Sequence, residues 1–121
     1  MNNTSVTGQL GEQAVVDRLR AEGCLIMERN WRSGRYEIDI IAIKEGCIRF
    51  VEVKTRSASN WNRPEDSIVA SKRRSMRNAA RAFMAHRYAG YEFRFDLAAV
   101  EPQPDGSCRI DYYEDILQSG W

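Results

Sequence analysis

Residues 36–56 read YEIDIIAIKEGCIRFVEVKTR and carry the strongest structural signal in the chain. Two runs rich in isoleucine, valine and phenylalanine, 36–43 and 47–56, are separated by the turn-forming pair Glu45-Gly46, which predicts a β-hairpin. A two-residue or a four-residue loop centred on this pair gives the same register, in which the numbers of facing residues sum to 91. Because both faces of the hairpin are largely apolar, we expect it near the centre of a sheet.

This register places charged side chains opposite one another at one end of the hairpin. Asp39 faces Glu52 and Glu37 faces Lys54, all on one face of the sheet. Two carboxylates whose Cβ atoms lie about 5 Å apart destabilise a strand pair unless something compensates their charge. One interpretation is a solvated ladder of surface charges, in which Glu37 and Lys54 form an ordinary cross-strand pair.

The other interpretation of the same residues is a metal site. Magnesium and manganese prefer oxygen ligands and often use one or two protein carboxylates together with water and a phosphate. Asp39 and Glu52 are therefore candidate metal ligands and catalytic residues. Lys54, two residues beyond Glu52 on the same face, is a candidate to stabilise transition-state charge or to position an attacking water.

The segment 8–23 predicts a helix, because straight-chain residues and alanine dominate it and Gly23 is placed to end it. Val15, Val16 and Leu19 fall on one side and form its expected core face. Glu12 points the same way, either as a carboxylate favoured by the helix dipole or as a third acidic group leaning toward the metal.

The remaining elements complete one predicted domain, residues 1–121. The pattern predicts extended segments at 24–31, 91–100 and 108–113, and a long helix at 67–88. The expected fold is α/β: a central mixed β-sheet flanked by helices, in the order α-β-β-β-α-β-β.

The formal net charge of +1 hides an uneven distribution. Residues 54–87 carry nine basic and two acidic side chains, a net +7, whereas residues 88–121 carry two basic and seven acidic ones, a net −5. This pattern is compatible with a nucleic-acid partner despite the near-neutral total. The candidate phosphate-binding residues are Arg56, Arg63, Lys72, Arg73, Arg74, Arg77 and Arg81.

Several of these basic residues have an equally ordinary explanation. The arginines of the second helix could form a solvated face. Lys72 lies on the apolar side of that helix, from where its ammonium could reach the carboxylates or extend to solvent. Trp61 could stack on an unpaired base or cover the core, and His86 is expected at the surface near the helix end.

The chain also indicates its compartment. No apolar run approaches the roughly 18 residues needed to span a bilayer, and the polar start lacks the features of a signal peptide. The cysteines Cys24, Cys47 and Cys108 form no paired motif and are expected to be reduced, small core residues rather than zinc ligands. We therefore expect a cytoplasmic protein that does not associate with membranes.

Five spaced motifs together resemble a known family. They are GQLGEQA (8–14), RNWR (29–32), EIDIIA (37–42), FVEVKTR (50–56) and RFD (94–96). In this order they resemble the YraN-like family of small bacterial proteins, which looks like a minimal member of the PD-(D/E)XK nuclease superfamily. Tyr36 stands where many members have glycine.

The resemblance implies a restriction-endonuclease-like fold, as in Holliday-junction resolvases. It also implies that Glu12 corresponds to the acidic residue of the first helix, Asp39 to the aspartate of the motif, and Glu52 and Lys54 to its E-x-K.

The expected function is that of a magnesium- or manganese-dependent endonuclease-like protein acting on DNA phosphodiester bonds, with branched or damaged DNA as candidate substrates. In this hypothesis Asp39, Glu52 and Glu12 hold the metal. The alternative is a non-catalytic nucleic-acid-binding module that retains the nuclease fold. A homodimer is expected by analogy with the junction resolvases.

Overall fold

The computed structural model describes residues 3–56 and 70–117. Within these residues, two helices and five strands follow one another: α1 (Asn3–Ala21), β1 (Leu25–Ser33), β2 (Tyr36–Lys44), β3 (Cys47–Thr55), α2 (Ala70–Met84), β4 (Glu92–Pro102) and β5 (Cys108–Tyr113). The predicted mixed α/β fold is confirmed, although the element bounds differ in detail. The predicted loop around Trp61, together with Arg63 and the expected helix start at Ser67, lies outside the described residues.

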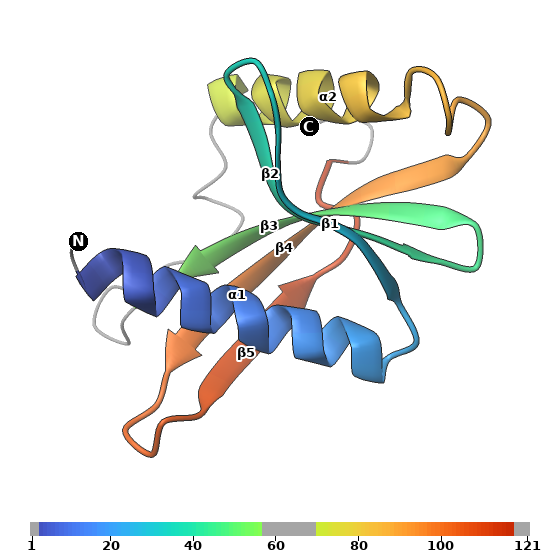
Figure 1. The fold of residues 1–121 in the computed structure, drawn as a ribbon. Coiled ribbons are helices and arrows are strands. Elements are labelled where there is room, and N and C mark those ends of the chain that lie inside the picture. The colour runs from blue at the N-terminus through green and yellow to red at the C-terminus, as the bar shows by residue number, and fades with distance from the viewer. Residues whose placement is uncertain (1–2, 57–69, 118–121) are drawn as a thin grey trace.

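The five strands form one sheet in the order β1-β2-β3-β4-β5. β3 and β4 run parallel, and the other neighbouring strands are antiparallel. β3 is therefore the central strand, as its apolar faces predicted. In Figure 1, α1 crosses one face of the sheet and α2 lies over the other, beside the far end of the β1–β2 hairpin.

The β2–β3 hairpin has the predicted register. Ile40 faces Val51, Ile41 faces Phe50, and Lys44 faces Cys47. The loop is the two-residue alternative, with Glu45 at φ 52° and Gly46 at φ 77°, as a type I′ turn requires.

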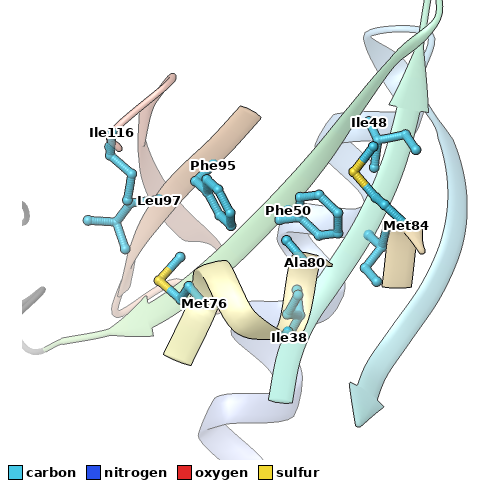
Figure 2. Close-up of a cluster of buried hydrophobic side chains, with 11 residues drawn as sticks. Ile38, Ile48, Phe50, Met76, Ala80, Met84, Phe95, Leu97 and Ile116 are labelled. Carbon is cyan, nitrogen blue, oxygen red and sulfur yellow. The ribbon is translucent and has the colours of Figure 1, made fainter. Parts of the chain in front are cut away.

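Two apolar clusters hold the helices on the sheet. Toward α2, Phe50, Phe95 and Leu97 pack against Met76 and Ala80 (Figure 2). Toward α1, the predicted core face of that helix is fully buried; it consists of Val15, Val16 and Leu19.

Gly23 ends α1, as predicted. Its φ is 94°, and its N–H donates to the Arg20 carbonyl while the Cys24 N–H donates to the Leu19 carbonyl. This is the Schellman arrangement, in which glycine tolerates the left-handed conformation that satisfies the last helix carbonyls. Cys24 then packs in the same cluster as Leu19, the core role expected for it.

Candidate functional site

The pairing of β2 with β3 stops at the point where the candidate carboxylates begin. The last facing pair is Ile40 with Val51, so Asp39 and Glu52 lie just past it, where the two strands separate. Asp39 replaces the missing strand contact with its side chain, because its Oδ2 accepts a 2.8 Å hydrogen bond from the Val53 N–H. We call this place the fork.

One sequence-based pairing at the fork is wrong. Glu37 does not face Lys54 in the ladder; it forms a 2.7 Å ion pair with Arg32 of β1 instead. The reason is that β2 pairs with β3 only from Ile40 onward, whereas the residues before Ile40 lie beside β1 alone.

A local change in β1 accompanies this separation. Asn30 lies opposite Asp39, between the pairs Arg29–Ile40 and Trp31–Ile38, and has a φ of 52°. Residues two apart in a regular strand share a face, but Ile38 packs toward α2 and Ile40 toward α1. The β1–β2 hairpin therefore changes the face that it presents at Asn30 and Asp39. This change brings the Asp39 side chain into the fork.

Asp39 and Glu52 share a side-chain hydrogen bond. Burial raises the pKa of Asp39, while the Val53 N–H and the bond from Glu52 oppose that rise. Burial also raises the pKa of Glu52 to about 7, and the charge of Asp39 adds to this effect. Near neutral pH the pair therefore holds a proton for a large part of the time.

Glu12 approaches the fork from α1, which lies on the face of the sheet opposite α2. Asn30 donates a 3.0 Å hydrogen bond to its Oε1, and an Arg29 nitrogen lies 3.5 Å from the same oxygen. Burial, followed by the charge of Asp39, raises the pKa of Glu12. Glu12 thus faces inward, as its helix position predicted, and is close enough to Asp39 for their charges to interact.

Neither Asn30 nor Arg29 was identified by the sequence as holding Glu12. Both lie in the RNWR motif. Their contacts to α1 depend on the change of face of the β1–β2 hairpin at Asn30, which no local sequence pattern reveals. The one available signal was the tolerance of asparagine for a left-handed backbone.

The two lysines near the fork differ in their surroundings. Lys54 follows Glu52 by two residues in a regular part of β3, paired with Ala99, and its side chain is exposed. Lys72 extends from the beginning of α2, and its Nζ lies 3.1 Å from Glu52 Oε2. The ammonium group in direct contact with the carboxylate pair is thus that of Lys72.

The pair formed by Asp39 and Glu52 fits a hard divalent cation. Its donor atoms are carboxylate oxygens, and Glu52 keeps 14% of its side chain exposed to solvent. Within residues 3–56 and 70–117, however, no group of three or more histidine, cysteine, aspartate or glutamate side chains is close enough together to hold a metal ion. Two ligands are therefore brought together, and Glu12 as a third stays a prediction.

The basic residues of α2 do not form one uniform stripe. Arg74 and Arg81 are exposed, whereas Arg73 and Arg77 are half-buried. Arg77 and Arg81 line a groove of about 590 Å³ between α2 and the start of β4, whose wall includes the half-exposed ring of Phe93. The other residues lining it are Met84, Ala85, Ala89, Arg94, Phe95, Asp115 and Leu117.

Other predicted positions are less informative. Arg56 is half-buried and its backbone N–H donates to the Val100 carbonyl at the end of β3. His86 is exposed beyond the end of α2, as expected. The three cysteines are free thiols.

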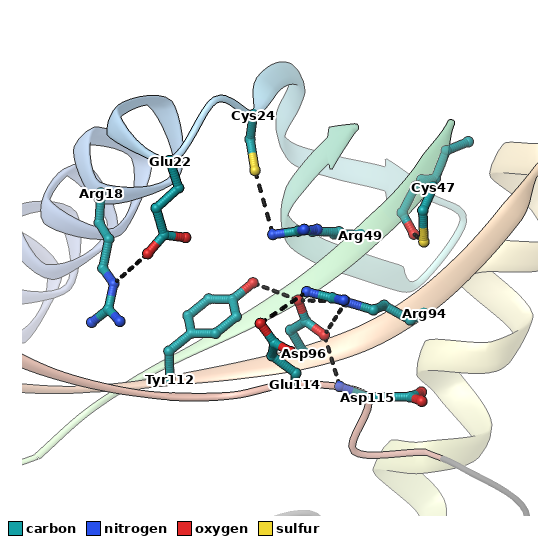
Figure 3. A network of polar contacts seen from close by, with 11 residues as sticks. Arg18, Glu22, Cys24, Cys47, Arg49, Arg94, Asp96, Tyr112, Glu114 and Asp115 are labelled. Carbon is teal, nitrogen blue, oxygen red and sulfur yellow. Dashed lines mark hydrogen bonds and ion pairs between the residues drawn. The ribbon is translucent and has the colours of Figure 1, made fainter. Parts of the chain in front are cut away.

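The RFD motif serves the fold rather than the fork. Asp96 is fully buried and accepts hydrogen bonds from Arg94 Nε (3.0 Å), Tyr112 Oη (2.6 Å) and the Asp115 N–H (2.9 Å) (Figure 3). Burial and the charge of Asp96 raise the pKa of Tyr112 well above its ordinary value, so that the phenol remains a donor. Asp96 pairs with Val51 and faces α1, on the opposite side of β4 from Leu97, the partner of Glu52. This network joins β4, β5 and the segment after β5.

Together these features define a small α/β protein with a carboxylate pair at the fork of a mixed five-stranded sheet. Residues 11–100 match the uncharacterised protein family UPF0102, and the chain belongs to that family. The resemblance to a YraN-like family is thereby confirmed.

Relatives at similar length support the assignment. The chain is 39% identical to a UPF0102 protein of Bacteroides thetaiotaomicron over 91% of this chain and 90% of that protein. It is 41% identical to one of Symbiobacterium thermophilum over 93% of this chain and 96% of that protein. Among solved structures, Pyrococcus furiosus SfsA in complex with Ca²⁺ matches with a TM-score of 0.39 and 13% identity, over 92% of this chain and 63% of that one. That likeness is too slight to carry an argument.

Neither helix in the described part of the chain is long and apolar enough to cross a membrane.

Proposed function

We propose that this protein is a metal-dependent endonuclease-like protein of the PD-(D/E)XK type that acts on DNA phosphodiester bonds. The observation that carries the proposal is the hydrogen-bonded pair of Asp39 and Glu52 at the fork. Two partly buried carboxylates in contact are costly unless a proton or a cation is bound between them. The restriction-endonuclease-like assignment of the fold belongs to the same proposal.

Each residue near the fork has a role in this proposal. Asp39 and Glu52 hold Mg²⁺ or Mn²⁺, which would supply Lewis-acid activation of the phosphodiester. Glu12, oriented by the hydrogen bond from Asn30, adds a third negative charge beside Asp39 and Glu52. Lys54 projects from the same face of β3 as Glu52 and offers positive charge to the scissile phosphate.

The basic residues of α2 support a DNA substrate. The exposed arginines Arg74 and Arg81 lie on α2, the helix that also provides Lys72 at the fork. Contacts of this kind bind phosphates without regard to sequence. They would hold the DNA backbone near the carboxylate pair.

Cleavage of plasmid and four-way-junction DNA, measured while Mg²⁺ or Mn²⁺ is titrated, tests the proposal. We expect metal-dependent cutting by the native protein and a loss of at least about 100-fold in Asp39→Asn and Lys54→Ala. Glu28→Gln, which neutralises an exposed carboxylate of β1, is the matched control and should cut normally. Equal residual cutting in all variants would trace the activity to a contaminant and reject the proposal.

The groove beside α2 favours a second candidate function, that of a non-catalytic nucleic-acid-binding module. Its arginines Arg77 and Arg81 can contact phosphates, and the half-exposed Phe93 ring offers a surface on which a base can stack. This candidate predicts DNA binding that is unchanged by chelation of metal and by Asp39→Asn, with no cutting by any variant.

A further inference from the structure

The ion pair between Lys72 and Glu52 joins the second helix to the fork. Lys72 Nζ lies 3.1 Å from Glu52 Oε2, and 14% of the Glu52 side chain is exposed. The positive charge of Lys72 also favours the ionised form of Asp39. The lysine therefore provides at the carboxylate pair the kind of charge compensation that a bound metal ion would provide.

Lys72 is able to leave this position. Its side chain is 40% exposed, so its ammonium can move into water while its aliphatic part stays against the protein. A divalent cation bound by Asp39 and Glu52 would lie within a few ångströms of the ammonium. Like charges repel strongly at that separation, so the ion and the ammonium compete for Glu52.

We propose that Lys72 is a place-holding cation: its ammonium neutralises the carboxylate pair while no metal is bound and is displaced from Glu52 when a divalent cation binds. This inference rests on the proposed metal site. It gives a role to the contact with the carboxylates, which was one of the sequence-based alternatives for Lys72, and replaces the phosphate contact that was also predicted for it.

Isothermal titration of the full chain with Mn²⁺ at pH 8 tests the proposal. Lys72→Gln should bind Mn²⁺ more tightly than the native protein, by about tenfold, because the competing charge is gone. Lys72→Arg keeps the charge and should bind about as the native protein does. Arg87→Gln is the charge-matched control: Arg87 follows α2, whose end lies about 18 Å along the helix axis from Lys72, and the change should alter affinity less than twofold at physiological salt.

Thermal unfolding gives a second readout of opposite sign. In the presence of EDTA at pH 8, Lys72→Gln should melt at a lower temperature than the native protein, because the carboxylate pair has lost its compensating charge. Saturating Mn²⁺ should then raise its melting temperature by more than it raises that of the native protein. An unchanged melting temperature of Lys72→Gln in EDTA, together with a Mn²⁺-induced rise no larger than that of the native protein, would overturn the place-holding role.

The outcomes separate this inference from the proposed function. The place-holding role is overturned if Lys72→Gln binds Mn²⁺ no more tightly than the native protein does. The metal site still stands in that case, provided that the native protein binds Mn²⁺ and Asp39→Asn does not. If the native protein and every variant fail to bind Mn²⁺, the place-holding role and the metal site are both rejected.

Discussion

Glu52 contacts both of the other charged side chains at the fork, Asp39 and Lys72. It shares a side-chain hydrogen bond with Asp39 and forms an ion pair with Lys72 of α2. Its pKa of about 7 lies well above the ordinary value of 4.5, chiefly because burial penalises the charged carboxylate. A glutamate in this environment binds a proton more tightly in the folded chain than in the unfolded one.

This pKa predicts how the stability of the metal-free protein depends on pH. Because the folded-state pKa is raised, the stabilising contribution of the proton is fully present below about pH 4.5 and is lost as the pH rises through about 7. Glu52→Gln mimics the protonated form and removes this loss. Between pH 5 and pH 8 the native protein should therefore lose roughly 3 kcal/mol more unfolding free energy than the variant.

Urea denaturation in EDTA at several pH values between 5 and 8 measures this difference. Glu28→Gln, on the exposed surface of β1, should follow the native protein throughout. Parallel profiles for Glu52→Gln and the native protein would show that the carboxylate is not destabilised by its surroundings.

At Gly11 the helix α1 lies close against the sheet. A methyl group at this position would lie 2.8 Å from Thr55 Oγ1 and 3.3 Å from Val100 Cγ1. Thr55 and Val100 face each other across β3 and β4. The missing side chain therefore lets the helix lie against the central strands one residue before Glu12.

Gly11→Ala should consequently destabilise the protein by about 1–2 kcal/mol. On an open helix surface the same change would stabilise by about 1 kcal/mol, because alanine is the better helix former. Here the contact with Thr55 must be relieved by moving the helix, since a β-branched side chain has few alternative rotamers.

Urea denaturation of Gly11→Ala, Thr55→Ala and the double variant tests this explanation. The double variant should be more stable than the sum of the two single effects predicts, because Thr55→Ala removes the hydroxyl that the new methyl group would meet. A stabilised Gly11→Ala would mean that the helix has room for the side chain.

Across the whole molecule, charge is separated along the chain. The +7 of residues 54–87 includes α2, whereas the −5 of residues 88–121 includes β5 and the segment that follows it. Since the exposed arginines Arg74 and Arg81 lie on α2, DNA binding should depend on salt despite the net charge of +1.

The double variant Arg74→Gln/Arg81→Gln should bind duplex DNA more weakly and with less salt dependence. Each phosphate contact contributes about 0.9 to the slope of log affinity against log salt, so the slope should fall by roughly 1.8. Fluorescence anisotropy with a labelled duplex in EDTA, between 50 and 200 mM salt, measures it. Arg20→Gln, an exposed arginine of α1 on the other face of the sheet, should leave the slope unchanged; an unchanged slope in the double variant would exclude these arginines from the interface.

Local patterns were sufficient for much of the fold. The alternation of apolar residues around Glu45-Gly46 identified the central hairpin and its register. The apolar side of α1 and its stop at Gly23 were likewise readable, because helix period and left-handed glycine are properties of neighbouring residues. The same alternation placed Asp39 and Glu52 at one end of the hairpin, and their side chains do meet.

Other features depend on contacts between residues far apart in the chain. The separation of β2 from β3 before Ile40, the turn at Asn30 and the ion pair of Lys72 with Glu52 each involve two or more elements. The helix pattern left the Lys72 ammonium with two alternatives, the carboxylates or solvent, and no short-range pattern encodes the other two features. All three result from how the β1–β2 hairpin and the two helices pack around the sheet. The residue types and their order thus specify which strands form and which carboxylates lie near each other, whereas tertiary packing decides which lysine compensates their charge.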